Sequence, residues 1–205
     1  MTRSLVILGT GGGAHDILDV IEATNATSST WEVAGFLDDD RAPGSQHLGF
    51  KVLGRLGDAA CLEGHYFINV IGSDKSYRRR PKILTSTGLV RERFATLVHP
   101  AALISSRVRL GHGTCIGFGV SVGGGALVGD HVTLCPGSII GHDSVIEDYA
   151  IVAPGAVISG LVRLGRNCYI GAGALIRQRL QIGEQSLVGM GAVVTRDVEG
   201  RSIVL

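Results

Sequence analysis

The sequence is poor in aromatic and charged residues, and these shortages exclude several classes of protein. Only 5% of its 205 residues are aromatic and 18% are charged, with a formal net charge of +1. A nucleic-acid-binding surface needs excess positive charge or stacking side chains, so no nucleic-acid partner is expected. No apolar run reaches the roughly 18 residues of a membrane span. The short apolar run at the N-terminus meets glycines where a signal peptide would continue, which predicts a cytoplasmic protein.

The cysteines lack the spacing of a metal or redox site. Cys61, Cys115, Cys135 and Cys168 form no C-x-x-C pair, so reduced and mostly buried thiols are expected. Glycine, in contrast, is abundant, with 31 residues. Because glycine does not recur at every third position, a collagen-like chain is excluded and the glycines need another explanation.

Residues 1–98 alternate strand-like and helix-like segments. Helical spacing of Ile17, Val20 and Ile21 predicts a helix. Strands alternating with helices predict βαβ units, a small parallel sheet and hence a Rossmann-like α/β domain. The expected strands cover 4–10, 32–40, 66–73 and 93–100, the helix covers 14–23, and a helix or turn covers 76–88.

Residues 99–205 follow a period of six. Every sixth residue from Ile104 to Val194 is Ile, Leu or Val, over sixteen positions. The residue two positions earlier is small or β-branched at every repeat except Leu180. This pattern predicts an all-β domain, a parallel β-helix in which three hexads make one coil and residues 18 apart stack. A β-sandwich would show alternation at every second residue instead.

His142 is the first candidate for a chemical role. It follows the interior Ile140 by two residues, so its side chain projects outward or lies at the start of a turn. Gly124 and Gly160 stack on it from the neighbouring coils and leave space beside the imidazole. An imidazole is the usual base near pH 7, and the adjacent Asp143 is placed to orient it. A solvent-exposed turn histidine has the same pattern, so the residues alone leave both interpretations open.

Three segments resemble a known family. They are "SIIGHDSVI" at 138–146, "PGAVISGLVRLG" at 154–165 and "VGMGAVVTRDV" at 188–198. With the two-domain order they resemble, over essentially the whole chain, the sialic-acid-cluster and bacillosamine-type sugar acyltransferases of the hexapeptide-repeat superfamily. The resemblance implies a left-handed β-helix, a homotrimer, and His142 as general base with Asp143 beside it.

The resemblance also implies the ligands. Acetyl-CoA is the expected co-substrate, with no metal, and the amine of a nucleotide-linked 4-amino-deoxy sugar for cell-surface polysaccharide is the expected acceptor. Transfer would be direct, with a backbone N–H near Gly160 stabilising the oxyanion. The implied acetyl-CoA contacts are Ile151, Gly160, Gly171, Ala172, Gly189 and Met190, and some relatives have a polar residue or histidine in place of Ile151.

The turn "GTGGGAHD", Gly9 to Asp16, lies between a strand and a helix, where backbone N–H groups can bind phosphate. By itself it fits an NAD-dependent oxidoreductase or a purely structural turn, although nothing after residue 100 resembles a dehydrogenase substrate domain. By resemblance, Gly11, Gly12 and Gly13 line the diphosphate or sugar, Asp38 and Asp39 the nucleoside, and Gly72 the base. Gly13 stands where relatives carry histidine.

Other functions remain open at this point. The same base and donor would serve O-acetylation of a sugar or sialic acid, and a non-catalytic nucleotide-sugar-binding trimer is a further alternative. A cysteine nucleophile is disfavoured because Cys168 points inward and Cys135 has no histidine partner in the sequence. A metal site is disfavoured because His112, His131 and His142 do not stack.

Overall fold

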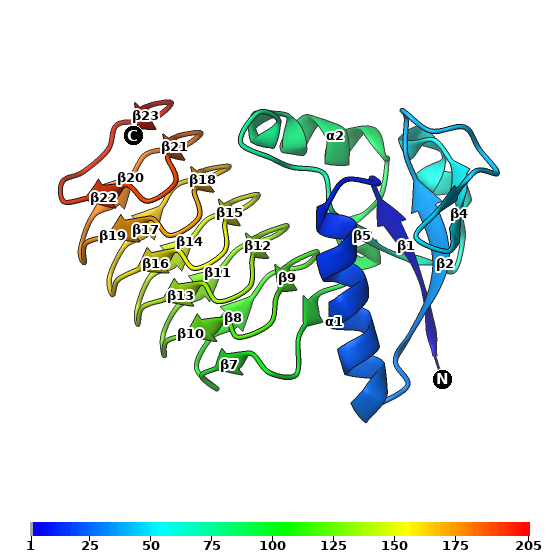
Figure 1. Ribbon diagram of the computed structural model, residues 1–205, viewed down its shortest axis with the longest axis horizontal. Helices are drawn as coiled ribbons and strands as arrows, with labels where there is room; N and C mark the ends of the chain where they lie inside the picture. The colour runs from blue at the N-terminus through cyan, green and yellow to red at the C-terminus, as the bar shows by residue number, and fades with distance from the viewer. Residues whose placement is uncertain (1) are drawn as a thin grey trace.

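The structure, a computed structural model that describes residues 2–205, consists of an α/β domain followed by a β-helix (Figure 1). The α/β domain has a five-stranded sheet in the order β3-β4-β2-β1-β5, parallel except for the β3–β4 pair. Its elements are β1 (Arg3–Leu8), α1 (Gly13–Thr27), β2 (Trp31–Leu37), β3 (Gln46–His47), β4 (Phe50–Gly54), the 3₁₀ helix η1 (Leu56–Cys61), β5 (Tyr66–Asn69), η2 (Tyr77–Arg79), α2 (Arg80–Ser86) and η3 (Arg91–Arg93).

Most elements of this domain confirm the predicted pattern, and the differences are shifted ends, an added hairpin and the place of the last strand. Helix α1 buries Ile17, Val20 and Ile21, as their spacing predicts. Strand β2 ends at Leu37, so the acids that follow it lie in a loop. The short β3–β4 hairpin was not expected, because Gln46–His47 carries no strand pattern. The last expected strand shortens to β6 (Leu97–Val98) and belongs to the β-helix, where it pairs with β9.

The β-helix has three faces, numbered here in the order in which the chain visits them. Face 1 is β6, β9 (Cys115–Ile116), β12 (Thr133–Leu134), β15 (Ile151–Val152), β18 (Tyr169–Ile170), β21 (Leu187–Val188) and β23 (Ile203–Val204). Face 2 is β7 (Leu103–Ile104), β10 (Ser121–Val122), β13 (Ile139–Ile140), β16 (Val157–Ile158), β19 (Leu175–Ile176) and β22 (Val193–Val194). Face 3 is β8 (Arg109–Leu110), β11 (Leu127–Val128), β14 (Val145–Ile146), β17 (Arg163–Leu164) and β20 (Gln181–Ile182).

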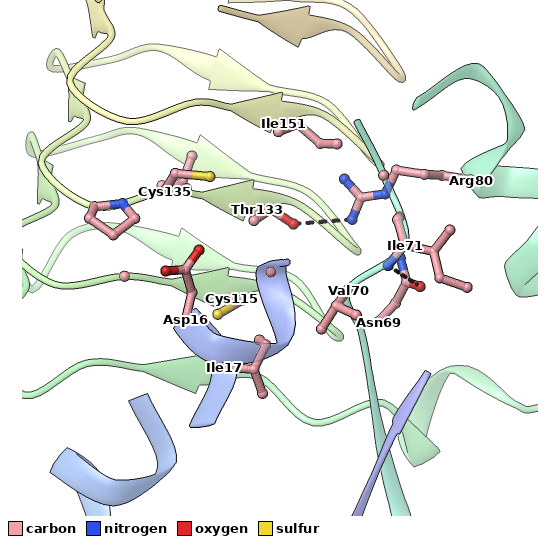
Figure 2. Close-up of a pocket in the computed structure, with 15 residues that line it drawn as sticks. Asp16, Ile17, Asn69, Val70, Ile71, Arg80, Cys115, Thr133, Cys135 and Ile151 are labelled. Carbon is pink, nitrogen blue, oxygen red and sulfur yellow. Dashed lines mark hydrogen bonds between the residues drawn. The ribbon is translucent and has the colours of Figure 1, made fainter. Parts of the chain in front are cut away.

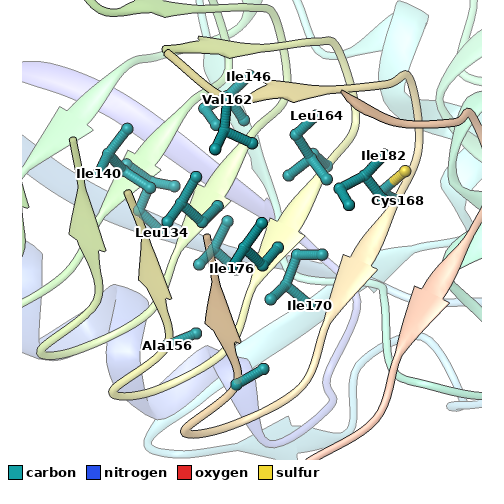
Figure 3. Close-up of a cluster of buried hydrophobic side chains, with 14 of the residues drawn as sticks. Leu134, Ile140, Ile146, Ala156, Val162, Leu164, Cys168, Ile170, Ile176 and Ile182 are labelled. Atoms are coloured by element: carbon teal, nitrogen blue, oxygen red, sulfur yellow. The ribbon is translucent and has the colours of Figure 1, made fainter. Parts of the chain in front are cut away.

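The interior of the β-helix is filled by the periodic aliphatic residues (Figure 3). Each strand from β7 to β22 ends on one of the sixteen predicted positions, and those from Ile116 onward are all buried. Strands pair in parallel at the expected stagger, with Ile140 opposite Ile158. Each buried aliphatic side chain contributes about 1.5–3 kcal/mol relative to exposure. The predicted left-handed parallel β-helix is confirmed.

The α/β domain packs on face 1 through a buried arginine. Arg80 is 2% exposed, and its Nη2 donates to the carbonyl of His131 at 2.9 Å and to Thr133 Oγ1 at 3.1 Å. In a coil nearer the C-terminus, the carbonyl of Gln185 accepts a hydrogen bond from the Tyr77 hydroxyl at 3.0 Å. These contacts fix the α/β domain against the coils. Over residues 2–205, no helix is both long and apolar enough to cross a membrane.

Candidate active site

His142 and Asp143 lie together at the corner between faces 2 and 3. His142 Nδ1 and Asp143 Oδ2 are 2.8 Å apart, and the two side chains are 65% and 58% exposed. Asp143 adopts the left-handed region at φ 56°, which turns its carboxylate back toward the ring. Because an ionised carboxylate only accepts, the hydrogen bond places the proton on Nδ1 and leaves Nε2 free to accept a proton.

Glycines frame the imidazole as the stacking predicts, but the space beside it is partly filled. A Cβ at Gly160 would lie 2.6 Å from His142 Nε2, so the ring rests directly on this glycine. On the other side, a Cβ at Gly124 would lie 2.5 Å from Nη2 of Arg107. The arginine therefore fills the space predicted to be open. The hexad pattern gives no signal for Arg107, since this turn position accepts many residue types.

The predicted nucleotide residues line one large pocket in the α/β domain, with a volume of about 810 Å³. Gly11, Gly12 and Gly13 form one wall and Gly72 lies on the facing loop. Helix α1 begins at Gly13 without a side-chain cap. The N–H groups of Ala14 and His15 donate to the carbonyls of Gly11 and Gly12, whereas those of Gly12 and Gly13 have no acceptor within residues 2–205 and are available to an anion. The other lining residues, which the sequence patterns did not indicate, include the guanidinium groups of Arg41 and Arg79.

Asp38 and Asp39 border the same pocket, but they also brace its wall. Asp38 Oδ2 accepts hydrogen bonds from the N–H and hydroxyl groups of Thr10, at 2.7 and 2.8 Å. Asp39 Oδ1 accepts from the N–H of Leu56 at 3.0 Å. Each carboxylate keeps lone pairs for a ligand. Their contact with a nucleoside remains a prediction.

A second, smaller cavity of about 80 Å³ adjoins this pocket where α1 meets face 1 (Figure 2). The two spaces share Gly13 and Gly72, together with Val70 and Ile71. The cavity also reaches Pro136, at the corner between faces 1 and 2. Sequence patterns did not predict it, because its walls come from distant segments. Its remaining lining residues are Asp16, Ile17, Asn69, Arg80, Cys115, Gly117, Thr133, Leu134, Cys135 and Ile151.

Two family models match the chain. The PglD N-terminal domain matches residues 4–81, and the bacterial transferase hexapeptide repeat matches residues 125–160. Among curated proteins no match was found. The two models thus cover the two parts of the structure separately.

Solved structures match the whole chain. The acetyltransferase domain of PglB from Neisseria gonorrhoeae, in complex with acetyl coenzyme A, is 28% identical with a TM-score of 0.84, over 99% of this chain and 96% of that one. A histidine-to-asparagine variant of perosamine N-acetyltransferase from Caulobacter crescentus, in complex with CoA and GDP-perosamine, is also 28% identical with a TM-score of 0.84, over 99% and 93%. The chain is an acyltransferase that carries a PglD N-terminal domain and bacterial transferase hexapeptide repeats.

In this acyltransferase the predicted acetyl-CoA residues fall in three places. Gly171, Ala172, Gly189 and Met190 lie at the corner between faces 1 and 2, above the cavity. Gly160 lies with His142 at the corner between faces 2 and 3. Ile151 is 6% exposed on face 1 and lines the cavity. A single chain therefore does not bring all of these residues together.

The cysteines and His131, which were the remaining candidate nucleophiles and metal ligand of the acyltransferase, lie in surroundings that fit a structural role. Burial raises the pKa of Cys115 and Cys168 to about 12 and that of Cys135 to about 11, so these thiols are protonated at neutral pH. His131 is buried between Phe94 and Tyr149. Within residues 2–205, no three histidine, cysteine or acidic side chains gather as a possible metal site.

Proposed function

We propose that the protein transfers an acetyl group from acetyl-CoA to the amine of a nucleotide-linked 4-amino-deoxy sugar. The observation that carries this proposal is the His142–Asp143 hydrogen bond on the β-helix wall, in a chain whose other domain holds a pocket of nucleotide size. The pair supplies a base for the amine, and the pocket supplies a place for the nucleotide.

The geometry of the pair assigns a role to each side chain. His142 Nε2 takes the proton from the attacking amine as the new N–C bond forms, and the thioester C–S bond breaks to release the CoA thiolate, which the imidazolium then protonates. Asp143 accepts the Nδ1–H bond throughout and stabilises the imidazolium that results. Transfer is direct, because the thiols of Cys115 and Cys135 at the cavity are protonated at neutral pH, the first buried and the second half-buried.

The complete site needs a second copy of the chain. The cavity that adjoins the nucleotide pocket reaches the corner between faces 1 and 2, whereas His142 lies at the corner between faces 2 and 3. A base that is 65% exposed is also poorly shielded from water. Placing the His142 corner of one copy against the cavity of another solves both problems.

Face 2 supports assembly as a homotrimer. Its outward residues are apolar except Ser121, and among them Leu103 is 74%, Leu175 46% and Val193 64% exposed. Ile139 is also exposed between them. Exposed apolar surfaces of this kind favour a subunit interface. In a closed ring of three copies, each copy would contribute one His142 and one nucleotide pocket.

The relatives support the same donor and acceptor. The Neisseria domain was solved with acetyl coenzyme A, and the Caulobacter enzyme with CoA and GDP-perosamine. By analogy, acetyl-CoA would run along the corner that carries Gly171, Ala172, Gly189 and Met190. Its thioester would then reach the end of the corner at the cavity, where the acceptor amine arrives.

His142→Ala tests the proposal. Loss of a general base lowers kcat by about 10²–10⁴-fold, measured as CoA thiol released in the presence of an amino-sugar nucleotide. His112→Ala is a matched control, because His112 has the same hexad offset at a different corner. Equal activity of His142→Ala and wild type would remove His142 from the mechanism.

A further inference from the structure

The small cavity beside the nucleotide pocket contains a carboxylate that neither the fold nor the proposed mechanism uses. Asp16 lies in the first turn of α1, and its side chain extends toward Cys135 in Figure 2. Among residues 2–205 it has no hydrogen-bond or ion-pair partner. Asp16 is exposed where it lines the cavity, and a carboxylate that borders a cavity without a partner can receive a donor from a ligand.

The other side-chain oxygens of the cavity already accept hydrogen bonds, and the buried Nε of Arg80, which has no partner within residues 2–205, can only donate. Asn69 Nδ2 donates to the carbonyl of Ile71, and Asn69 Oδ1 accepts from the N–H of Ile71, both at 3.1 Å. Thr133 Oγ1 accepts from Arg80, which is itself a donor and cannot accept. Asp16 supplies the only carboxylate among the described residues that line the cavity.

The position of the cavity identifies the group that would meet Asp16. A nucleotide in the large pocket, with its diphosphate at the Gly11–Gly13 turn, directs the attached sugar past Gly13 into the adjoining cavity. The same cavity ends at Gly117 and Pro136, which lie in the corner column that continues to Gly171 and Ala172. The acceptor group and the thioester therefore converge beside α1.

We infer that Asp16 accepts a hydrogen bond from the amino group of the acceptor sugar and selects amine over hydroxyl acceptors. This inference rests on the proposed function, because it takes the nucleotide-linked sugar as the ligand. An ionised carboxylate gains more from an amine that carries positive charge than from a neutral hydroxyl. The ammonium form would bind at Asp16 and release one proton to solvent, and the neutral amine would then attack while His142 takes its second proton.

Calorimetric binding in the absence of acetyl-CoA tests the inference without turnover. The probes are matched pairs of UDP-, dTDP- and GDP-linked sugars that differ only in a 4-amino or 4-hydroxyl group. Wild type should bind the amine of at least one pair about 10- to 100-fold more tightly than its hydroxyl partner. Asp16→Asn, which keeps the shape of the side chain, should reduce that preference to below about threefold.

Asp19→Asn is the matched control, because Asp19 lies one turn further along α1 and does not line the cavity. It should retain the full preference. No preference in wild type, or an unchanged preference in Asp16→Asn, would overturn the inference.

Kinetics separate this inference from the proposed function. Asp16→Asn should raise the KM for the amino sugar and leave the KM for acetyl-CoA unchanged. If wild type releases CoA and Asp16→Asn has the same constants, the function stands and the role of Asp16 is wrong. If wild type releases no CoA but binds amines through Asp16, acetyl transfer is wrong and the amine site stands.

Discussion

Gly160→Ala tests whether catalysis depends on where the imidazole of His142 rests. A Cβ at position 160 would lie 2.6 Å from Nε2 and 2.9 Å from both Cδ2 and Cε1, whereas ordinary contact begins at 3.4 Å. The ring must therefore retreat by about 0.8 Å. Gly160 has no positive φ, so alanine fits its backbone and the change acts on the side chain above it.

A displacement of about 1 Å at a reacting group costs up to about 10²-fold, so we expect kcat to fall by one to two decades. Since the His142 side chain is 65% exposed, the free energy of unfolding should change by less than about 0.5 kcal/mol. CoA release gives kcat and the KM for acetyl-CoA, and thermal melting gives the stability.

Gly124→Ala is the control for this variant, since its Cβ meets the mobile end of Arg107 on the opposite side of the ring. It should stay within about threefold of wild type, a change smaller than 1 kcal/mol. A Gly160→Ala protein with normal kcat would refute the argument. A rise in the KM for acetyl-CoA alone would show that Gly160 serves the donor and not the base.

Two further predictions concern assembly and pH. Leu175→Glu places a charge on face 2 and should convert the proposed trimer of 21.4-kDa chains to monomers with loss of activity, as seen by sedimentation, whereas Leu53→Glu in the α/β domain should not. Burial, followed by the charge of Arg80, lowers the pKa of His131 to about 4. The folded state thus binds fewer protons than the unfolded state between pH 6.5 and 4, and stability should fall by about 3 kcal/mol as the pH drops through this range. Chemical denaturation at several pH values should show a flatter dependence for His131→Asn, because asparagine tolerates the φ of 57° and does not titrate.

The β-helix was predictable because its signal is periodic and physical. One aliphatic residue in every six must fill the interior, so Ile140 and Ile158 identify both the strand and the coil above it. The outward direction of His142 follows from the same register. Its contact with Gly160 follows as well, since residues 18 apart stack.

The features that were not predicted depend on side chains meeting across distant segments. Arg107 fills the space beside Gly124 because its long side chain reaches over a neighbouring turn, which no repeat pattern encodes. The cavity exists because α1 packs on face 1 and brings Asp16 to Cys135. The packing of the two domains depends on Arg80 and its three acceptors. In the sequence, Arg80 is one of three adjacent arginines in "YRRRPK", and nothing there distinguishes it as the buried one.

The most direct test of the account is CoA release by the wild-type protein with acetyl-CoA and a panel of UDP-, dTDP- and GDP-linked 4-amino sugars. The account predicts stoichiometric thiol release with at least one of these amines, formation of the N-acetyl product by mass spectrometry, and loss of both in His142→Ala. Turnover confined to hydroxyl acceptors, or no turnover with any amine, would contradict it.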